Sequence, residues 1–295
     1  MQNQAPTLGF IGLGVMGGPM CCNVVRKHPA PVHAFDITPA AIEEVRKVGG
    51  LAAASVVEVA RAADIVFLSL PGGNQVREVC LGDGGLASVG KPGMVIVDLS
   101  TTSVAEARHV GEKLAEKHIL FADAPVARTR QAARDGALSI MVGASDELFA
   151  RIEPLLSYMG SDVTLCGGVG CGQVVKLINN TLVFEHVAAL AEMMIVAERA
   201  GVSRDTLAGA VSKGSGDSFV LRNHGMKAMV PGVFPKKAFP SSYVLKDLGY
   251  AMELAESMGI EPRLPRSIEK YYRDAIAQGL GEKYFPTIID VIGKS

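Results

Sequence analysis

Two glycine motifs carry the residue types that could do chemistry in this chain. The first, Gly12-Leu13-Gly14-Val15-Met16-Gly17, directly follows an apolar run at residues 8–11. The second, Gly170-Cys171-Gly172, opens a predicted helix on which Lys176 and Asn180 share one face, a turn apart. The first motif is typical of a dinucleotide cradle, and the second positions an amine that can carry a proton. Together they predict an alcohol or hydroxyacid dehydrogenase.

The first motif has the sequence context that a dinucleotide site requires. Gly12 permits the tight turn out of a strand, Gly14 lets the backbone approach a pyrophosphate, and Gly17 lets helix and strand pack closely. The phosphates would lie on the N-terminus of the following helix. We expect all six residues of the motif to bind the cofactor. The alternative is that the glycines only form a tight turn.

Asp36 ends the second predicted strand and indicates which dinucleotide is bound. A carboxylate there accepts hydrogen bonds from both ribose hydroxyls of NAD and repels the 2′-phosphate of NADP. The next residues, Ile37-Thr38-Pro39, include no basic side chain. We therefore expect NAD rather than NADP. The alternative is that Asp36 only caps the following helix.

Two further segments are expected to line the ribose and nicotinamide. Leu70 and Pro71 end the strand at residues 65–70, and Thr101 follows the strand at residues 94–99. Both segments lie at the carboxyl ends of strands, which is where ligands bind in open parallel sheets.

Lys176 is the predicted proton carrier. Hydride transfer to a carbonyl leaves an alkoxide that needs a proton, and the reverse reaction needs a base. Its neighbours Val174, Val175, Leu177 and Ile178 are apolar, and a lysine among such residues is costly unless it has a partner or a function. Asn180 could hold the substrate hydroxyl. The alternative is a lysine at a domain edge whose ammonium reaches water.

These residues must be positioned by a regular alternation of strands and helices over residues 1–166. The predicted strands are mostly continuous apolar runs, as in parallel strands covered on both faces. They are Thr7–Ile11, Val32–Phe35, Ile65–Leu70, Met94–Leu99, Ile119–Ala122, Leu138–Val142 and Val163–Cys166. Helix starts are marked by Thr38-Pro39, the capping box at residues 55–58, Thr102 and Ser145. The pattern predicts an α/β fold with a doubly wound, Rossmann-type sheet.

Residues 167–295 show a different pattern and predict an all-helical domain. From Gly172 to Arg199 there is no proline or internal glycine, and apolar residues cover most of the helix circumference. A helix that is apolar nearly all round is expected to be buried. Ser203 would cap the next helix. So much apolar helix surface also predicts a subunit interface, hence a homodimer or homotetramer.

Composition excludes several classes of protein. The 295 residues carry a net charge of −1, which gives no electrostatic case for binding nucleic acid or an anionic membrane. Charged residues and His186 interrupt the long apolar helix, so we expect no membrane span. The five cysteines form no Cys-x-x-Cys pair, and no signal peptide precedes the first strand. We expect free thiols, a cytoplasmic protein and no bound metal.

The motifs, taken in order, resemble those of the β-hydroxyacid dehydrogenase family, which includes 6-phosphogluconate dehydrogenase as a distant member. The matching segments are residues 9–20, Asp123-Ala124-Pro125-Val126, residues 170–180 and Lys246-Asp247-Leu248. The resemblance covers nearly the whole chain. It implies that Lys176 is the catalytic acid/base, that Asn180 binds substrate, and that Lys246 lies by the nicotinamide and substrate. It also implies a small 3-hydroxy acid and its semialdehyde as substrates, of the 3-hydroxyisobutyrate or 2-hydroxy-3-oxopropionate type.

One departure from the family pattern concerns the substrate. Where the family usually has Ser-Gly-Gly after the segment that begins at Asp123, this chain has Ala127-Arg128-Thr129. Arg128 presents paired donors that suit a carboxylate, sulfonate or phosphate. We expect Asp123 and residues 127–129 to contact the substrate and Arg128 to receive its acid group. The motif is also similar to that of sulfolactaldehyde reductases, so a sulfonate substrate stays open. A solvated basic helix face is the other alternative for Arg128.

Two rival functions remain. A cofactor-binding sensor or structural protein could keep the fold without the chemistry, but Lys176 and Asn180 would then have no reason to be present together. Imine reductases resemble this family but lack the lysine, so Lys176 disfavours that function.

Overall fold

The computed structural model describes residues 5–236 and 238–294. The chain divides into two compact units, one extending to Lys176 and the other beginning at Leu177. Each unit is described separately below.

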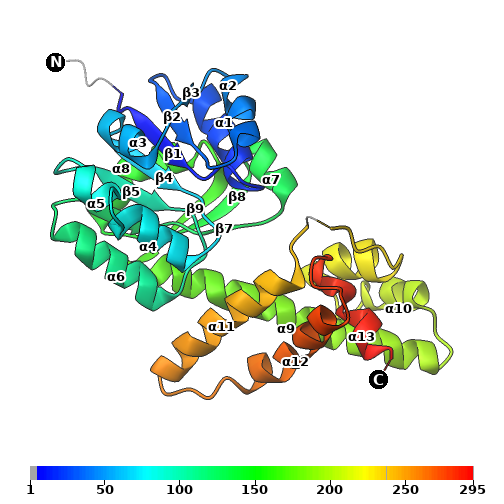
Figure 1. Ribbon diagram of the computed structural model, residues 1–295. Coiled ribbons are helices and arrows are strands. Elements are labelled where there is room, and N and C mark those ends of the chain that lie inside the picture. Colours follow the sequence, from blue (N-terminus) through cyan, green and yellow to red (C-terminus); the bar gives the residue numbers. More distant parts are fainter. Residues whose placement is uncertain (1–4, 237, 295) are drawn as a thin grey trace. The chain divides into compact units, whose positions relative to one another are not determined.

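The first unit is built on one mixed sheet with helices on both faces (Figure 1). Its order is β3-β2-β1-β4-β5-β6-β8-β7, with β9 also paired to β8. The strands are β1 (Leu8–Ile11), β2 (Val32–Phe35), β3 (Leu51–Ala52), β4 (Ile65–Leu68), β5 (Val95–Asp98), β6 (Leu120–Asp123), β7 (Val126–Ala127), β8 (Leu138–Gly143) and β9 (Gly160–Gly167). This order confirms the predicted doubly wound fold.

Strand direction differs from the prediction at one edge. Strands β1 to β6 pair in parallel, but β8 runs antiparallel to both β6 and β7. The reason is the short connection from β7 to β8 over residues 128–137, since parallel neighbours need a crossover of a dozen or more residues. The two-residue strands β3 and β7 were not expected, because such short segments leave no period in the sequence.

Strand residues alternate between two hydrophobic cores, one on each face of the sheet. Phe10, Phe67 and Val97 belong to one core, and Ile11, Val66 and Ile96 to the other. The first core is covered by α1 (Gly17–Lys27), α2 (Pro39–Arg46), α7 (Arg130–Asp135) and α8 (Asp146–Leu156). The second is covered by α3 (Val56–Ala62), α4 (Gly73–Leu81), α5 (Leu86–Val89) and α6 (Val104–Ala115).

Most of the predicted helix caps are present. The hydroxyls of Ser55, Ser145 and Ser203 each accept a hydrogen bond from a backbone N–H three residues later. The prediction that Thr102 caps α6 is wrong, because Ser103 is the N-cap residue and accepts from Glu106 N. Thr102 instead contributes its backbone N–H to another contact, described below.

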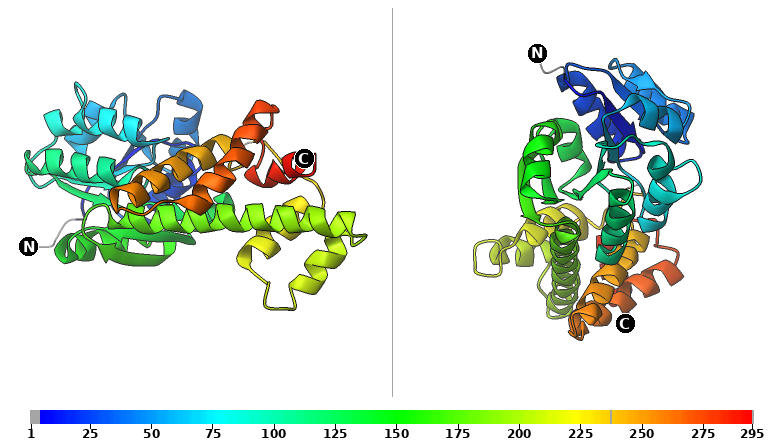
Figure 2. Two further views of the ribbon diagram at one scale, coloured as in Figure 1. Left: turned by 90° about the horizontal axis from the view of Figure 1, so that it is seen from below. Right: turned by 90° about the vertical axis from the view of Figure 1, so that its left-hand side faces the viewer.

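The long helix α9 (Cys171–Arg199) runs without interruption for 29 residues, as the left view of Figure 2 shows. The expectation that it is buried all round is wrong. One face is exposed along its length and consists of Val175, Ile178, Leu182, His186, Ala189, Met193 and Val196. We call these seven residues the α9 stripe. By length and composition alone α9 could cross a membrane, a property shared by core helices of soluble proteins, and 44% of its most apolar window is buried.

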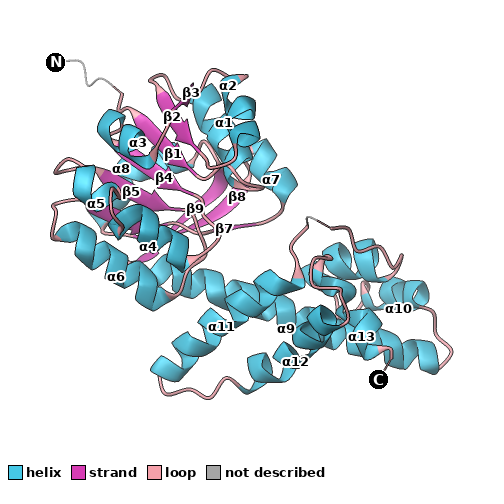
Figure 3. Cartoon of the chain, in the orientation of Figure 1, coloured by secondary structure: helices cyan, strands magenta, loops and turns pink. Residues whose placement is uncertain are grey.

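The second unit contains helices but no named strand among its described residues (Figure 3). Its other helices are α10 (Arg204–Val211), the π-helix η1 (Leu221–Met229), α11 (Ser241–Ser257), α12 (Arg263–Ala277), the 3₁₀-helix η2 (Phe285–Ile288) and α13 (Ile289–Ile292). The core is formed by the inner face of α9, including Phe184 and Val187, with Tyr272 of α12 and Phe285 of η2.

The boundary between the units lies within α9. We expected domains of residues 1–166 and 167–295, whereas the compact units divide after Lys176. The reason is that the first turns of α9 make their hydrogen bonds to the sheet unit, through Asp123 and Gln173. Lys176 thus belongs to the unit that carries the dinucleotide motif.

Candidate cofactor and catalytic site

The glycine motif after β1 has the geometry of a phosphate cradle. Gly12 has φ of +92°, which favours glycine, and a Cβ there would overlap the Ser69 carbonyl. A Cβ at Gly17 would overlap the Gly12 carbonyl, so this glycine brings α1 against the turn. A Cβ at Gly14 would meet nothing within 4 Å, so the space above that peptide is open to a ligand. Helix α1 has no acidic residue in its first turn, which suits bound phosphates.

Asp36, at the end of β2, is held beside this turn. Its Oδ2 accepts from Leu13 N at 2.6 Å and its Oδ1 accepts from Thr38 N at 2.7 Å. A carboxylate has about four lone-pair sites, so two acceptor positions are left for ribose hydroxyls. The residues present therefore fit an NAD-type dinucleotide, with Val15 and Met16 flanking the turn.

The loops after β4 and β5 are tied to each other. The Ser100 hydroxyl accepts from Leu70 N at 2.9 Å, which joins the Leu70-Pro71 segment to the Ser100-Thr101-Thr102 segment. The Ser100 amide in turn donates to Asp98 Oδ1 at 3.0 Å. These two loops follow β4, which pairs with β1, and β5, which pairs with β4, at the carboxyl ends where the cofactor was expected.

Asp123 is buried beneath the start of α9. It is fully buried, its Oδ1 accepts from Gly170 N at 2.6 Å, and its Oδ2 accepts from Gln173 N at 2.8 Å. Burial raises the pKa of its carboxyl to about 6, against the opposing effect of these backbone donors. Both carboxylate oxygens thus bind the start of α9, and the expected contact of Asp123 with substrate stays a prediction.

Gln173 is a site residue that sequence reasoning missed. Its side chain is fully buried and bridges the start of α9 to the β5 loop. The Oε1 atom accepts from Thr102 N at 3.1 Å, and Nε2 donates to the Ser100 carbonyl at 2.8 Å. The only feature of the sequence that could have indicated this role is its position three residues before Lys176.

Lys176 and Asn180 are both buried, each 8% exposed, on consecutive turns of α9. A buried amine and a buried amide one turn apart match the predicted pairing of a proton carrier with a substrate ligand. Asn180 Oδ1 also accepts from Asn179 Nδ2 at 3.2 Å.

Asp247 of α11 is the second residue that sequence reasoning missed, although the motif containing it had been noted. It is buried and its Oδ2 accepts from Asn180 Nδ2 at 2.8 Å. This bond fixes the orientation of the Asn180 amide, with its nitrogen toward Asp247 and its oxygen as an acceptor on the other side. Lys246 lies beside Asp247, with Nζ 3.4 Å from Oδ1, and over the rings of Tyr243 and Tyr250.

The Ala127-Arg128-Thr129 segment departs from the expected arrangement. The Arg128 guanidinium donates to the Ala137 carbonyl at 2.7 Å and to Ser161 Oγ at 2.9 Å, and pairs with Asp162 at 2.7 Å. Hydrogen bonds from Ser161 and Arg128 lower the pKa of the Asp162 carboxyl. Arg128 is thus not presented as an unpaired cation. The hydroxyl of Thr129 caps α7 by accepting from Ala132 N, and Ala127 pairs with Ser139 in the sheet.

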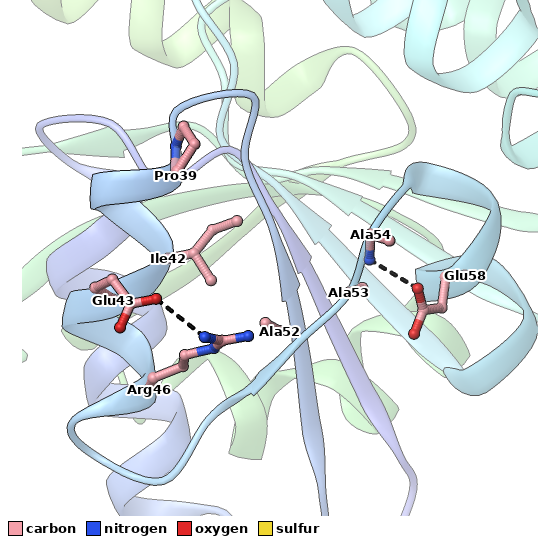
Figure 4. A pocket seen from close by; sticks show the side chains of 8 residues that line it. All are labelled: Pro39, Ile42, Glu43, Arg46, Ala52, Ala53, Ala54 and Glu58. Carbon is pink, nitrogen blue, oxygen red and sulfur yellow. Dashed lines mark hydrogen bonds and ion pairs between the residues drawn. The ribbon is translucent and has the colours of Figure 1, made fainter.

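A pocket elsewhere on the sheet unit contains none of these residues (Figure 4). It lies between α2 and the segment from β3 to α3, with Ile42 and Ala52 among its apolar lining residues. Its polar groups are already used, since Glu43 pairs with Arg46 and Glu58 accepts from Ala54 N. We assign no chemistry to this pocket.

Both halves of the chain match known family models. The NAD-binding domain of 6-phosphogluconate dehydrogenase matches residues 7–168. The NAD-binding model of NADP-dependent 3-hydroxyisobutyrate dehydrogenase matches residues 170–292.

Individual relatives are similar over nearly their whole length. The chain is 36% identical to 2-(hydroxymethyl)glutarate dehydrogenase of Eubacterium barkeri, covering 96% of this chain and 94% of the relative. It is 32% identical to 2-hydroxy-3-oxopropionate reductase of Escherichia coli, covering 92% of each. A solved structure of Mycobacterium tuberculosis 3-hydroxyisobutyrate dehydrogenase with L-serine superposes with a TM-score of 0.89 at 28% identity, covering 98% of this chain and 99% of that one.

Proposed function

The chain belongs to the β-hydroxyacid dehydrogenase family of NAD(P)-dependent oxidoreductases, and on this premise we propose that Lys176 is its catalytic acid/base. The reaction interconverts a hydroxy acid and its semialdehyde. The observation that carries the proposal is the buried pair of Lys176 and Asn180 on consecutive turns of α9, with Asn180 oriented by Asp247.

Lys176 and Asn180 have different proposed roles in the reaction. A nicotinamide dinucleotide held by the Gly12–Gly17 turn and Asp36 would supply a hydride acceptor for oxidation and a hydride donor for reduction. Lys176 Nζ takes the hydroxyl proton in the first direction and gives it back to the carbonyl oxygen in the second. The Asn180 Oδ1 atom accepts from the same hydroxyl and aligns it. The family resemblance assigns Lys246, which carries a second positive charge, to the cofactor and substrate site, and we propose the same role here.

We propose NAD rather than NADP as the preferred cofactor. The support is the Asp36 carboxylate, which is fixed by two backbone donors and has acceptor positions left for ribose hydroxyls. A 2′-phosphate in the same place would meet this negative charge without a basic partner from residues 37–39.

The substrate we propose is a small 3-hydroxy acid whose acid group is received by Arg128. An exposed ion pair such as Arg128–Asp162 is worth only about 0–1 kcal/mol, so a bidentate acid group can replace Asp162. The relatives named above act on hydroxy acids with carboxylates, and L-serine is itself a small 3-hydroxy acid. A sulfonate substrate is the second candidate, because a guanidinium fork suits that group equally well.

We also propose that the protein is a homodimer or homotetramer in a reducing compartment such as the cytoplasm. The support for assembly is the exposed apolar α9 stripe, and the support for the compartment is that all five cysteines are free.

The decisive test replaces Lys176 by Ala. The wild type is assayed on 3-hydroxyisobutyrate, 2-(hydroxymethyl)glutarate, 2,3-dihydroxypropane-1-sulfonate and a neutral alcohol, with NAD in the oxidative direction. Lys176→Ala should lower kcat on the best substrate by the roughly 10²–10⁴-fold typical of losing general acid–base catalysis. NADH binding, followed by fluorescence titration, should be retained.

The matched control is Lys117→Ala, which removes an exposed lysine from the sheet unit. It should change neither kcat nor NADH binding. Near-normal turnover by Lys176→Ala would show that another group carries the proton. A wild type that binds NADH but oxidises none of the acids would favour a cofactor-binding sensor.

A further inference from the structure

We infer that Asp123 and Gln173 are positioning residues that together hold the start of α9, and therefore Lys176, in fixed register with the loop at residues 100–102. We call these two residues the α9 clamp. The inference rests on the proposed function in one respect only, which is that Lys176 is taken as the acid/base. The contacts themselves all lie within the sheet unit.

The first half of the clamp is the buried Asp123 carboxylate at the end of β6. It accepts from two backbone amides of the helix start, Gly170 N at 2.6 Å and Gln173 N at 2.8 Å. The first amides of a helix have no partner within the helix, so a carboxylate brought by another strand satisfies them and suits the helix dipole. Because two amides donate to the two oxygens of one planar carboxylate, they fix both the position of the helix start along its axis and its rotation about that axis.

The second glycine motif allows the backbone to approach this carboxylate closely. A Cβ at Gly172 would lie 2.8 Å from Asp123 Oδ2 and would overlap the Met141 carbonyl, and a Cβ at Gly143 would overlap the carboxylate itself. Gly170 has φ of +92°, which favours glycine. The glycines therefore allow the backbone to reach Asp123, which explains why this motif precedes the lysine.

The second half of the clamp is the Gln173 side chain, which forms two hydrogen bonds with one loop. Its Oε1 accepts from Thr102 N at 3.1 Å and its Nε2 donates to the Ser100 carbonyl at 2.8 Å. Ser100 also accepts from Leu70 N through its hydroxyl. A chain of hydrogen bonds thus runs from the β4 loop through the β5 loop to a residue three positions before Lys176.

The chemical cost of this arrangement favours a role in positioning over a role in stability. A fully buried carboxylate is expensive, and apolar packing of the same volume usually stabilises a fold as well or better. What the polar contacts add is one fixed geometry, and an error of about 1 Å in the position of a catalytic group costs about 10²-fold in rate.

The test uses the full-length protein with three variants. Gln173→Met keeps the length of the side chain but removes both hydrogen bonds, and Asp123→Asn turns one acceptor into a donor that faces an amide N–H. The control is Gln131→Met on α7, where the exposed Gln131 bonds only locally, to Asp135 four residues on. For each protein we would measure amide hydrogen exchange without cofactor, thermal unfolding, and kcat and KM on the best hydroxy acid.

We expect Gln173→Met to speed exchange of the Thr102 amide, and Asp123→Asn to speed exchange of the Gly170 and Gln173 amides, each at least 10-fold. Both variants should lower kcat about 10- to 100-fold, with KM changed less than threefold, at temperatures well below their unfolding. Gln131→Met should match the wild type throughout.

The outcomes separate the clamp from the proposed function. Unchanged exchange at those amides in both variants would overturn the clamp, whatever the activity. Faster exchange with unchanged kcat would overturn the positioning role and leave a purely structural contact. If the wild type oxidises no hydroxy acid, the proposed function fails, while the exchange data still decide whether the clamp exists.

Discussion

Arg128 occupies a backbone conformation that normally belongs to glycine. Its φ is +88°, in a region where a side chain with a Cβ costs of order 1–3 kcal/mol. The family pattern that this chain resembles usually has glycine at this position, which would occupy the same conformation without strain. Strain of this kind is typical of functional sites, which supports a role for the guanidinium in recognising the substrate.

We predict that Arg128→Gly lowers kcat/KM for acid substrates roughly 10- to 150-fold, as expected for losing a charge-assisted contact worth about 1.5–3 kcal/mol. Glycine is the suitable replacement because it relieves the backbone instead of straining it. Arg128→Lys should not restore activity, because an ammonium lacks the planar fork.

Two comparisons sharpen this prediction. Asp162→Asn frees the guanidinium from its partner and should lower KM for acids, whereas Arg128→Gly should leave a neutral alcohol unaffected. Equal losses for acid and alcohol would make Arg128 a surface residue. A larger loss for a sulfonate than for a carboxylate would favour the sulfonate substrate.

Asp36 gives a second prediction at the level of one residue. Asp36→Ala should weaken NADH binding, because the ribose hydroxyls lose their acceptor. It should also reduce the ratio of kcat/KM with NADH to kcat/KM with NADPH. The check is kcat/KM with each cofactor for wild type and variant. A wild type that prefers NADPH would contradict the proposed role of this carboxylate.

The sequence predicted the elements that carry the candidate site residues where a motif lies on contiguous residues. The glycine motif follows β1 and Asp36 follows β2, as expected. Lys176 and Asn180 lie on the predicted long helix α9. The roles of Asp123 and Gln173 could not be predicted, because their partners lie about 47 to 73 positions away in the chain. Long-range hydrogen bonds of this kind leave no periodic pattern in a sequence.

Among the elements, those with long apolar runs were predicted best. Strands β1, β2, β4, β5 and β6 were expected within two residues of their ends, and α9 within one. The antiparallel direction of β8 and the π-helix η1 were not predicted. Both depend on tertiary context, namely the short connection from β7 to β8 and the packing of η1 against neighbouring helices.

The π-helix carries a histidine that should make the second unit sensitive to pH. His224 lies on η1, its Nδ1 is 2.6 Å from the Tyr284 hydroxyl, and the ring packs against Phe285. Burial, with a smaller effect from Lys227, lowers the pKa of His224 from 6.5 to about 4. The unfolded chain therefore binds a proton that the folded chain does not, between pH 6.5 and about 4.

Because the unfolded state takes up this proton, His224 leaves the free energy of unfolding at its full value above pH 6.5. That free energy then decreases as the pH falls from 6.5 toward 4. The loss should reach about 2 kcal/mol at pH 5. Urea unfolding of wild type at pH 7.5 and pH 5 should show it, and the double variant His224→Phe/Tyr284→Phe should lack this component. The double change avoids leaving the Tyr284 hydroxyl without a partner. An identical pH dependence in both proteins would show that other groups cause the effect.

At the scale of the whole molecule, the α9 stripe is the surface best suited to a second copy of the chain. Apart from His186, its residues are symmetric about the midpoint between Glu185 and His186, with Leu182 opposite Ala189 and Ile178 opposite Met193. An antiparallel pairing about a two-fold axis would therefore bring apolar side chains together along the whole stripe.

We predict that Leu182→Glu weakens assembly at least 100-fold, since each carboxylate buried without a partner costs several kcal/mol. Sedimentation velocity over a range of concentrations is the measurement. Val233→Glu is the control, because Val233 is also an exposed apolar residue but lies outside the stripe. A wild type that is monomeric at high concentration would show that the stripe is not a self-association surface.

The division of the chain inside an unbroken helix has a consequence for motion. Lys176 closes the first compact unit and Asn180 belongs to the second, yet the same rigid element carries both. Four helical residues span about 6 Å along the axis, and that spacing is set by backbone hydrogen bonding alone. A displacement of one unit against the other thus leaves the interval between proton carrier and substrate ligand unchanged. The spacing between these two side chains therefore does not depend on how the two units are placed relative to each other.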